Sequence, residues 1–67
     1  MSDESFARWL AENDTHCRNA FGISGQEFAR QWRAGGYGPI EQYVDSGNWQ
    51  DDLILRLGRA LNEADEL

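Results

Sequence analysis

Apolar residues recur at helical spacing through most of the chain. In residues 2–21 one helical face is formed by Phe6, Leu10, Cys17 and Phe21. Residues 12–16 are mediocre helix formers in the middle of this pattern. The segment is therefore predicted either as one helix from about Ser2 to Phe21, or as two short helices with Asp14 as the second cap.

Residues 22–36 carry the signals of a helix stop followed by a helix start. Gly22 supplies the left-handed residue on which a helix commonly ends. Ser24 and Glu27 form the S-x-x-E capping box. In that motif the serine hydroxyl accepts from the backbone N–H of the glutamate, whose side chain returns to the serine N–H. A helix is predicted over 25–34, ended by Gly35 and Gly36, with its inward face made of Phe28, Ala29 and Trp32.

The second half predicts a short helix and then a long one. Pro39 suits a first helical position, and Ile40, Tyr43 and Val44 follow at i, i+3 and i+4, enough for a turn or two of helix. Asn48 is predicted to cap the last helix. Gly58 lies within that helix, where it would permit a close helix crossing. The apolar stripe of the last helix consists of Trp49, Leu53, Ile54, Leu57, Ala60, Leu61 and Ala64.

No segment shows the two-residue alternation of a strand. The predicted fold is therefore all-α, a small compact bundle of three to four short helices in which residues 1–67 make a single helical domain. A domain of this size buries a smaller share of the surface of its unfolded chain than a larger domain does, so its aromatic side chains must supply much of the core. Small domains of this kind often gain stability by self-association, and a homodimer is therefore kept as an alternative to a monomer.

Charge narrows the classes of partner. The 67 residues carry a formal net charge of -6, with twelve acidic residues, six arginines and no lysine. Most of this charge lies after residue 34. An acidic surface repels phosphate backbones and favours basic partners. We expect a protein partner with a basic surface, and no nucleic-acid partner.

The same composition bears on the compartment. Cys17 is the single cysteine, so a disulfide-stapled secreted domain is not expected. The longest aliphatic run is Leu53–Leu55, too short to span a bilayer. The first residues are acidic where a signal peptide would be basic. A cytoplasmic protein with no membrane partner is the expectation.

Candidate chemistry is sparse. Ser24 follows Gly22 as in a hydrolase elbow, but that motif needs glycine where Gln26 stands. His16 is the single histidine, and with one cysteine it cannot supply a four-ligand zinc site. Asp45-Ser46-Gly47 resembles the Asp-Ser-Leu of acyl carrier proteins, with Gly47 in place of the leucine. We expect no enzyme, no cofactor and no metal, and keep a small enzyme or carrier protein as an alternative.

Residues 23–29 resemble the second helix of helix-turn-helix repressors. That resemblance implies a DNA-binding regulator using Arg30 and Arg33, which is the main alternative function. The segment that would enter the groove, near residues 39–44, offers no arginine to read bases. Arg30 and Arg33 have two other uses, as ion-pair partners of acids in this chain or as anchors for a carboxylate on a partner.

Tryptophan and acidic residues make the preferred site. Trp9 lies to one side of the first helical face and Trp49 begins the last helix, so either could stay partly exposed as an anchor for a partner. The candidate partner-binding residues are Trp9, Trp49, Arg30, Arg33, Asp45, Asp51 and Asp52. In the mimicry version of the hypothesis, phosphate-like positions in a basic groove are taken by Asp45, Asp51, Asp52, Glu63, Asp65 and Glu66.

The chain resembles, in size and charge, phage-encoded inhibitors such as anti-CRISPR proteins and nucleic-acid mimics, and it shares that profile with antitoxin-like regulators. The function expected from sequence is a small acidic non-enzymatic protein-interaction module that binds a partner and regulates or inhibits it. A chain with arginine but no lysine is compatible with a GC-rich genome, which favours a bacterial or phage origin.

Overall fold

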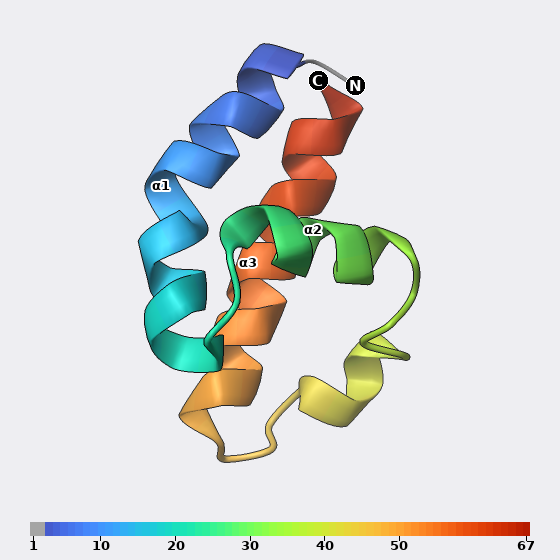
Figure 1. Ribbon diagram of the computed structural model, residues 1–67. Coiled ribbons are helices and arrows are strands. Elements are labelled where there is room, and N and C mark those ends of the chain that lie inside the picture. The colour runs from blue at the N-terminus through green and yellow to red at the C-terminus, as the bar shows by residue number, and fades with distance from the viewer. Residues whose placement is uncertain (1–2) are drawn as a thin grey trace.

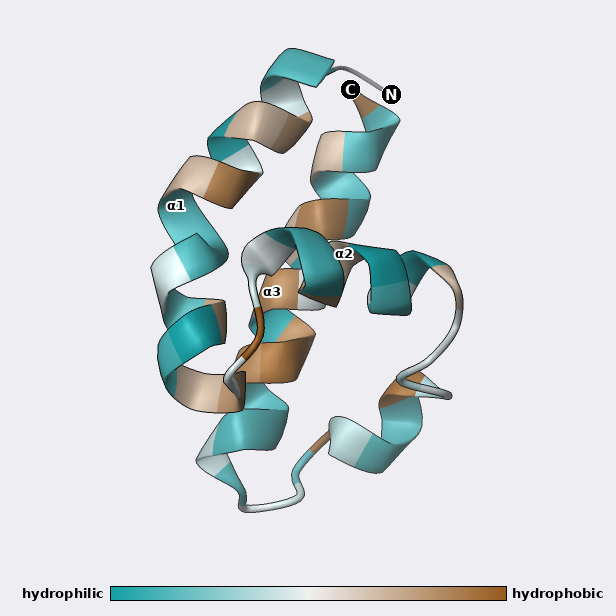
Figure 2. Ribbon diagram, viewed as in Figure 1, coloured by the Kyte–Doolittle hydropathy of each residue, from teal (hydrophilic) through white to brown (hydrophobic). Residues whose placement is uncertain are grey.

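The computed structural model describes residues 3–67, which form three α-helices and one 3₁₀ turn: α1 (Asp3–Phe21), α2 (Gly25–Arg33), η1 (Ile40–Tyr43) and α3 (Trp49–Glu66). α1 and α3 lie side by side and antiparallel, and α2 starts beside α1 and crosses in front of α3 (Figure 1). No strand occurs in this range, so the predicted all-α bundle is confirmed. Hydrophobic and hydrophilic residues alternate along α1 and α3, as expected of amphipathic helices (Figure 2).

α1 continues without a break through the weak helix formers at its centre. The alternative with two short helices is therefore wrong, and the predicted start at Ser2 lies outside the described residues. Asp14 does act as a cap, but for α2: its Oδ1 accepts the backbone N–H of Gly25 at 2.7 Å. Its Oδ2 accepts from Arg18 one turn further along α1, at 2.8 Å. Both polar contacts are made from the helix surface, so they do not interrupt the helix.

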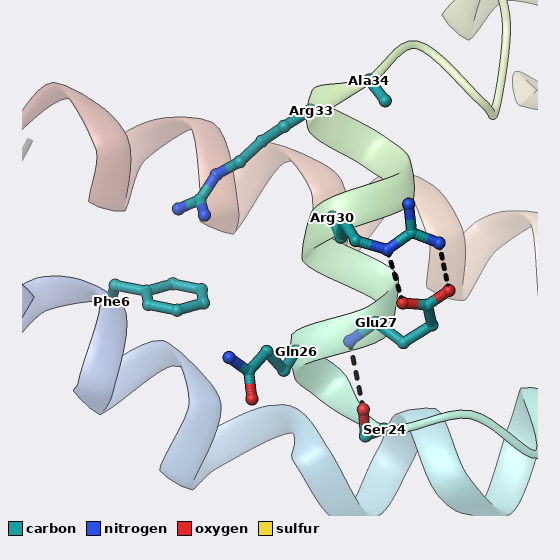
Figure 3. A pocket seen from close by; sticks show the side chains of 7 residues that line it. All are labelled: Phe6, Ser24, Gln26, Glu27, Arg30, Arg33 and Ala34. Carbon is teal, nitrogen blue, oxygen red and sulfur yellow. Dashed lines mark hydrogen bonds and ion pairs between the residues drawn. The ribbon is translucent and has the colours of Figure 1, made fainter.

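α2 begins as predicted, but only half of the capping box forms. The Ser24 hydroxyl accepts the Glu27 N–H at 3.1 Å, and Gly22 has the left-handed φ of 72° expected at the end of α1. The Glu27 carboxylate does not return to Ser24. It accepts instead from Arg30, as Figure 3 shows, and from Gln31 on the same helix. A charged donor one turn away is a stronger partner than a neutral backbone N–H.

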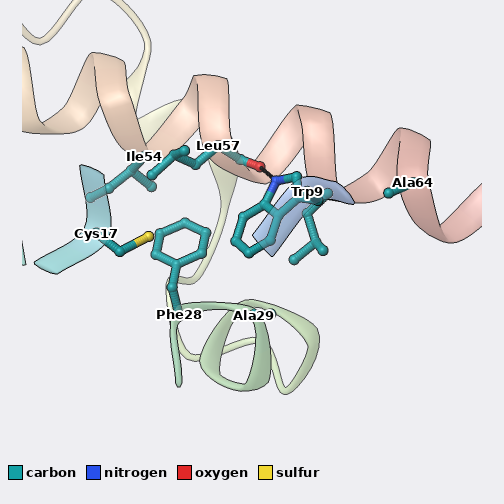
Figure 4. Packing of buried hydrophobic residues seen from close by; sticks show 8 residues of the cluster. Trp9, Cys17, Phe28, Ala29, Ile54, Leu57 and Ala64 are labelled. Carbon is teal, nitrogen blue, oxygen red and sulfur yellow. Dashed lines mark hydrogen bonds between the residues drawn. The ribbon is translucent and has the colours of Figure 1, made fainter. Parts of the chain in front are cut away.

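The core is centred on Phe28 of α2, which is fully buried. Its ring lies 6.0 Å from Trp9, 6.0 Å from Phe21 and 5.0 Å from Tyr37, centroid to centroid. The Cys17 side chain points toward the same ring (Figure 4). These contacts join α2 to α1, and Ile54, Leu57 and Leu61 of α3 belong to the same core cluster as Phe28.

Gly58 provides the close crossing predicted from sequence. The indole of Trp32, on α2, lies against its backbone, so that a methyl group at this position would overlap the ring. The Trp32 indole N–H donates to Asn62 Oδ1 at 3.0 Å, one turn along α3. The absence of a side chain at Gly58 therefore sets how closely α2 approaches α3 at their crossing.

The turn or two of helix predicted after Pro39 is the single 3₁₀ turn η1. Pro39 precedes this turn as its cap, with an extended backbone, and is not its first helical residue. Val44 lies just past the turn with 45% of its surface exposed. The chain then passes through Asp45, a non-glycine residue with a positive φ of 55°, to reach α3.

Candidate functional site

Trp49, the first residue of α3, is the large aromatic side chain that the fold leaves in solvent. Its surface is 65% exposed, whereas Trp9 is 4% exposed. The Trp9 indole N–H donates to the carbonyl of Leu57 at 3.1 Å inside the core (Figure 4). The expectation that Trp9 stays partly exposed is therefore wrong, and a docking surface cannot include it. The expected exposure of Trp49 is confirmed.

The backbone that carries Trp49 is anchored on both sides. Asn48 caps α3 through Oδ1, which accepts the Gln50 N–H at 2.8 Å. The Gln50 side chain then donates to the carbonyl of Ala20, near the end of α1, at 3.1 Å. Trp49 stands between these two contacts, so it projects from a fixed helix end. A rigidly held aromatic side chain loses little entropy when it enters a pocket.

The candidate aspartates fall in two positions around this tryptophan. Asp52 lies one turn after Trp49, which places it on the same face of α3, and it is exposed. Asp51 lies on another face and is half-buried. Asp45 is exposed in the turn before α3. No ion pair involving these three carboxylates occurs within residues 3–67. Asp51 and Asp52 also stabilise the positive end of the α3 dipole.

Arg30 and Arg33 are engaged by acids of the same chain. Arg30 donates two hydrogen bonds to the Glu27 carboxylate, from Nε at 2.7 Å and from Nη2 at 2.5 Å. This guanidinium lowers the pKa of Glu27 from 4.5 to about 2. Arg33 donates to Asp65 of α3 with Nε at 3.0 Å, and this bond raises the arginine's pKa. The Arg33 guanidinium also lies 4.4 Å from the centre of the Phe6 ring, toward which it points in Figure 3.

Glu27, Arg30 and Arg33 line an open groove between α1 and α2, whose walls include Phe6, Gln26 and Ala34 (Figure 3). Each arginine in it already has a carboxylate partner, so an incoming anion would compete with an existing ion pair. Asp65 is likewise taken up by Arg33, which removes it from the set of acids free to imitate phosphates. The remaining free acids lie mainly on η1, the following turn and α3.

The reactive side chains do not converge. Cys17 is fully buried, and burial raises the pKa of its thiol, which disfavours the nucleophilic thiolate. Ser24 is occupied as the α2 cap, and His16 is exposed on α1. Within residues 3–67 no three His, Cys, Asp or Glu side chains are grouped so as to hold a metal ion. None of the helices described is both long enough and apolar enough to cross a membrane.

Two exposed apolar residues were missed from the sequence. Val44 at 45% and Leu67 at 77% exposure both lie at the margins of helical segments. The turn residues Asp45 to Gly47 directly after Val44 were the available sign that its helix ends early. No protein-family model, curated protein or solved structure matches the chain.

Proposed function

We propose that this chain is a small non-enzymatic interaction module that inserts Trp49 into an apolar pocket of a protein partner and so regulates or inhibits it. The observation that carries the proposal is the 65% exposure of a tryptophan whose helix start is anchored to α1 through Gln50. Burial of a tryptophan side chain is among the largest single contributions to protein association. The single thiol is free and buried, in keeping with action in a cytoplasm.

The charges around Trp49 specify the surroundings of that pocket. Asp45 and Asp52 are exposed and form no ion pair within the described residues. A partner with lysine or arginine around an apolar pocket would satisfy them and would be attracted by the net charge of -6. Such rim charges mainly accelerate association and decrease in effect with salt, while the buried indole determines the dissociation rate.

The arrangement supports a protein partner better than DNA. Arg30 and Arg33, which a DNA-binding regulator would use, are paired with Glu27 and Asp65. After α2, the position of a recognition helix is occupied by η1, a 3₁₀ turn of four residues. A helix must enter the major groove for the usual helix-turn-helix reading. Enzyme and carrier functions have no converging side chains in residues 3–67 to support them.

The test begins with capture from a lysate of the native host, treated with nuclease and washed at low and high salt. The captured protein is then purified, and its binding is measured by calorimetry. Trp49→Ala should weaken binding at least about 30-fold, the effect of losing a central anchor. The matched control is Gln26→Ala, an exposed change on α2, which should leave the affinity unchanged.

Asp52→Asn should lower the association rate and reduce its salt dependence, with little effect on dissociation. Unchanged affinity of the Trp49→Ala variant would overturn the proposal. Capture that disappears with nuclease and requires Arg30 would instead establish the DNA-binding alternative.

A further inference from the structure

The outer face of α3 carries a straight stripe of six residues. Their spacing alternates between four and three positions, which keeps side chains on one face of a helix. α2 packs on a different side of α3, at Gly58, Asn62 and Asp65, and crosses in front of it in Figure 1. The stripe consists of Trp49, Leu53, Arg56, Ala60, Glu63 and Leu67. Leu53 and Ala60 are half-buried at the edge of the core, and the other four are exposed. α1 borders the stripe on one side, where Arg8 and Glu12 line a shallow groove with Ala60 and Glu63.

The charges in this stripe are unpaired and opposite. Three arginines form ion pairs within residues 3–67, and Arg56 is not among them; Glu63 is likewise in no pair. Arg56 lies one turn before Ala60 and Glu63 lies one turn after it. The side-chain charges of the stripe therefore sum to zero in a chain of net charge -6, whereas Asp45 and Asp52 near Trp49 are both acidic.

An arrangement with opposite charges on either side of a small residue is complementary to itself. Two such helices placed antiparallel across a two-fold axis at Ala60 bring Arg56 of each opposite Glu63 of the other. The same axis brings Leu53 opposite Leu67, and Ala60 lets the two helix backbones approach closely. An isologous dimer interface requires this kind of self-complementarity. A basic partner would instead leave Arg56 facing like charge.

We propose that the stripe on α3 binds a second copy of this chain, forming a two-fold antiparallel dimer with Ala60 at its axis. Trp49 lies further from Ala60 than Leu67 does, so it extends past the end of the second α3. The two Trp49 side chains would then stand at opposite ends of the dimer, about 33 Å apart at the usual helical rise. The dimer itself does not depend on the proposed function; its use as a bivalent docking module does.

The test is sedimentation equilibrium on the purified chain over concentrations from about 10 µM to about 1 mM, the range in which weak dimers dissociate. The wild type should dimerise. Residue 56 of each copy faces residue 63 of the other, so Arg56→Glu or Glu63→Arg brings like charges together at both pairs of the dimer. Each change should weaken dimerisation about 10-fold or more. The double variant restores both pairs and should return to within about 3-fold of wild type. Glu41→Arg, on η1, makes the same charge change as Glu63→Arg away from the stripe and should have no effect.

The position of the axis is tested by disulfide cross-linking. Ala60→Cys brings two thiols together at the axis and should give a covalent dimer on mild oxidation, while Cys17 stays buried and unreactive. Gln42→Cys, exposed on η1, should not cross-link. A wild type that is monomeric over the whole range, charge reversals without effect, or equal cross-linking of the two cysteine variants would each overturn the proposal. None of these readouts involves the partner of Trp49, so either proposal can fail alone.

Discussion

The Asp14 carboxylate of α1 accepts the backbone N–H of Gly25, the first residue of α2, at 2.7 Å. Arg18 holds the other carboxylate oxygen at 2.8 Å, and together these donors lower the pKa of Asp14. Gly25 is buried so closely against α1 that a Cβ would stand 3.1 Å from the Asp14 Cα. One aspartate thus fixes where the second helix starts on the first.

Asp14→Ala should lower the melting temperature, because the Gly25 N–H then loses its acceptor at a site packed against α1. Glu12→Ala, an exposed carboxylate on the same helix with no ion pair in the described residues, is the matched control. Arg18→Ala should cost less than Asp14→Ala, since it leaves the bond to Gly25 in place. Thermal unfolding followed by circular dichroism gives all three values. Equal effects of Asp14→Ala and Glu12→Ala would contradict the capping role.

Gly58→Ala should destabilise the fold although alanine is the better helix former by about 1 kcal/mol. The added methyl overlaps the Trp32 ring, and overpacking of this kind costs about 1–3 kcal/mol. Trp32→Phe removes the overlapped part of the ring, so the double variant should be more stable than the two single changes predict. A urea denaturation cycle measures this coupling. Additive effects would show that the glycine and the indole are independent.

Much of the fold was predictable because its signals are local. The Ser24 cap, the left-handed Gly22 and the Asn48 cap each depend on neighbours within a few residues, and all three are confirmed. Gly58 was recognisable because glycine inside a strong helix needs a packing reason. The all-α architecture follows from these boundaries together with helical periodicity.

The predictions that were wrong concern contacts between residues that lie far apart in the sequence. Trp9 is buried where its indole N–H donates to the carbonyl of Leu57, 48 positions away. The periodicity of one helix cannot predict a contact with another helix so far along the chain. Asp14, the expected cap of a second helix within residues 2–21, instead caps α2 through Gly25, eleven positions away. Arg33 selects Asp65 from several available acids only because α2 crosses α3 at Gly58. Of the candidate site residues, Trp49 was predictable as exposed because a helix start with polar neighbours offers little to cover it.

The ion pair of Glu27 and Arg30 should make stability depend on pH in acid. The pKa of Glu27 falls from an ordinary value of 4.5 to about 2 in the folded chain, so its contribution is complete above 4.5. That contribution is lost as the pH falls toward 2. Glu27→Gln should therefore lower the melting temperature at pH 7 and approach the wild type near pH 2. Glu41→Gln, which removes an unpaired carboxylate from η1, should differ little from wild type at pH 7. A Glu27→Gln deficit that is constant from pH 7 to 2 would contradict the ion-pair origin.

Ser24→Ala should cost about 1 kcal/mol, the usual loss of an N-cap. The reason is that the Glu27 N–H loses its acceptor at the first turn of α2. Urea denaturation measures the loss, and binding to the captured partner, per folded molecule, should be unchanged. Lost binding or activity at unchanged stability would show that the serine has a functional role beyond capping.

The two tryptophans Trp9 and Trp49 should separate stability from recognition. Trp9→Phe removes the donor to the Leu57 carbonyl and leaves a gap in the core, so it should cost about 1–3 kcal/mol. Trp49→Phe should change the free energy of unfolding by less than about 0.5 kcal/mol, because the indole is mainly in solvent. It should also remove the most solvent-exposed, red-shifted part of the tryptophan fluorescence. A large loss of stability from Trp49→Phe would mean that this side chain is covered in solution, which would contradict its role as an exposed anchor.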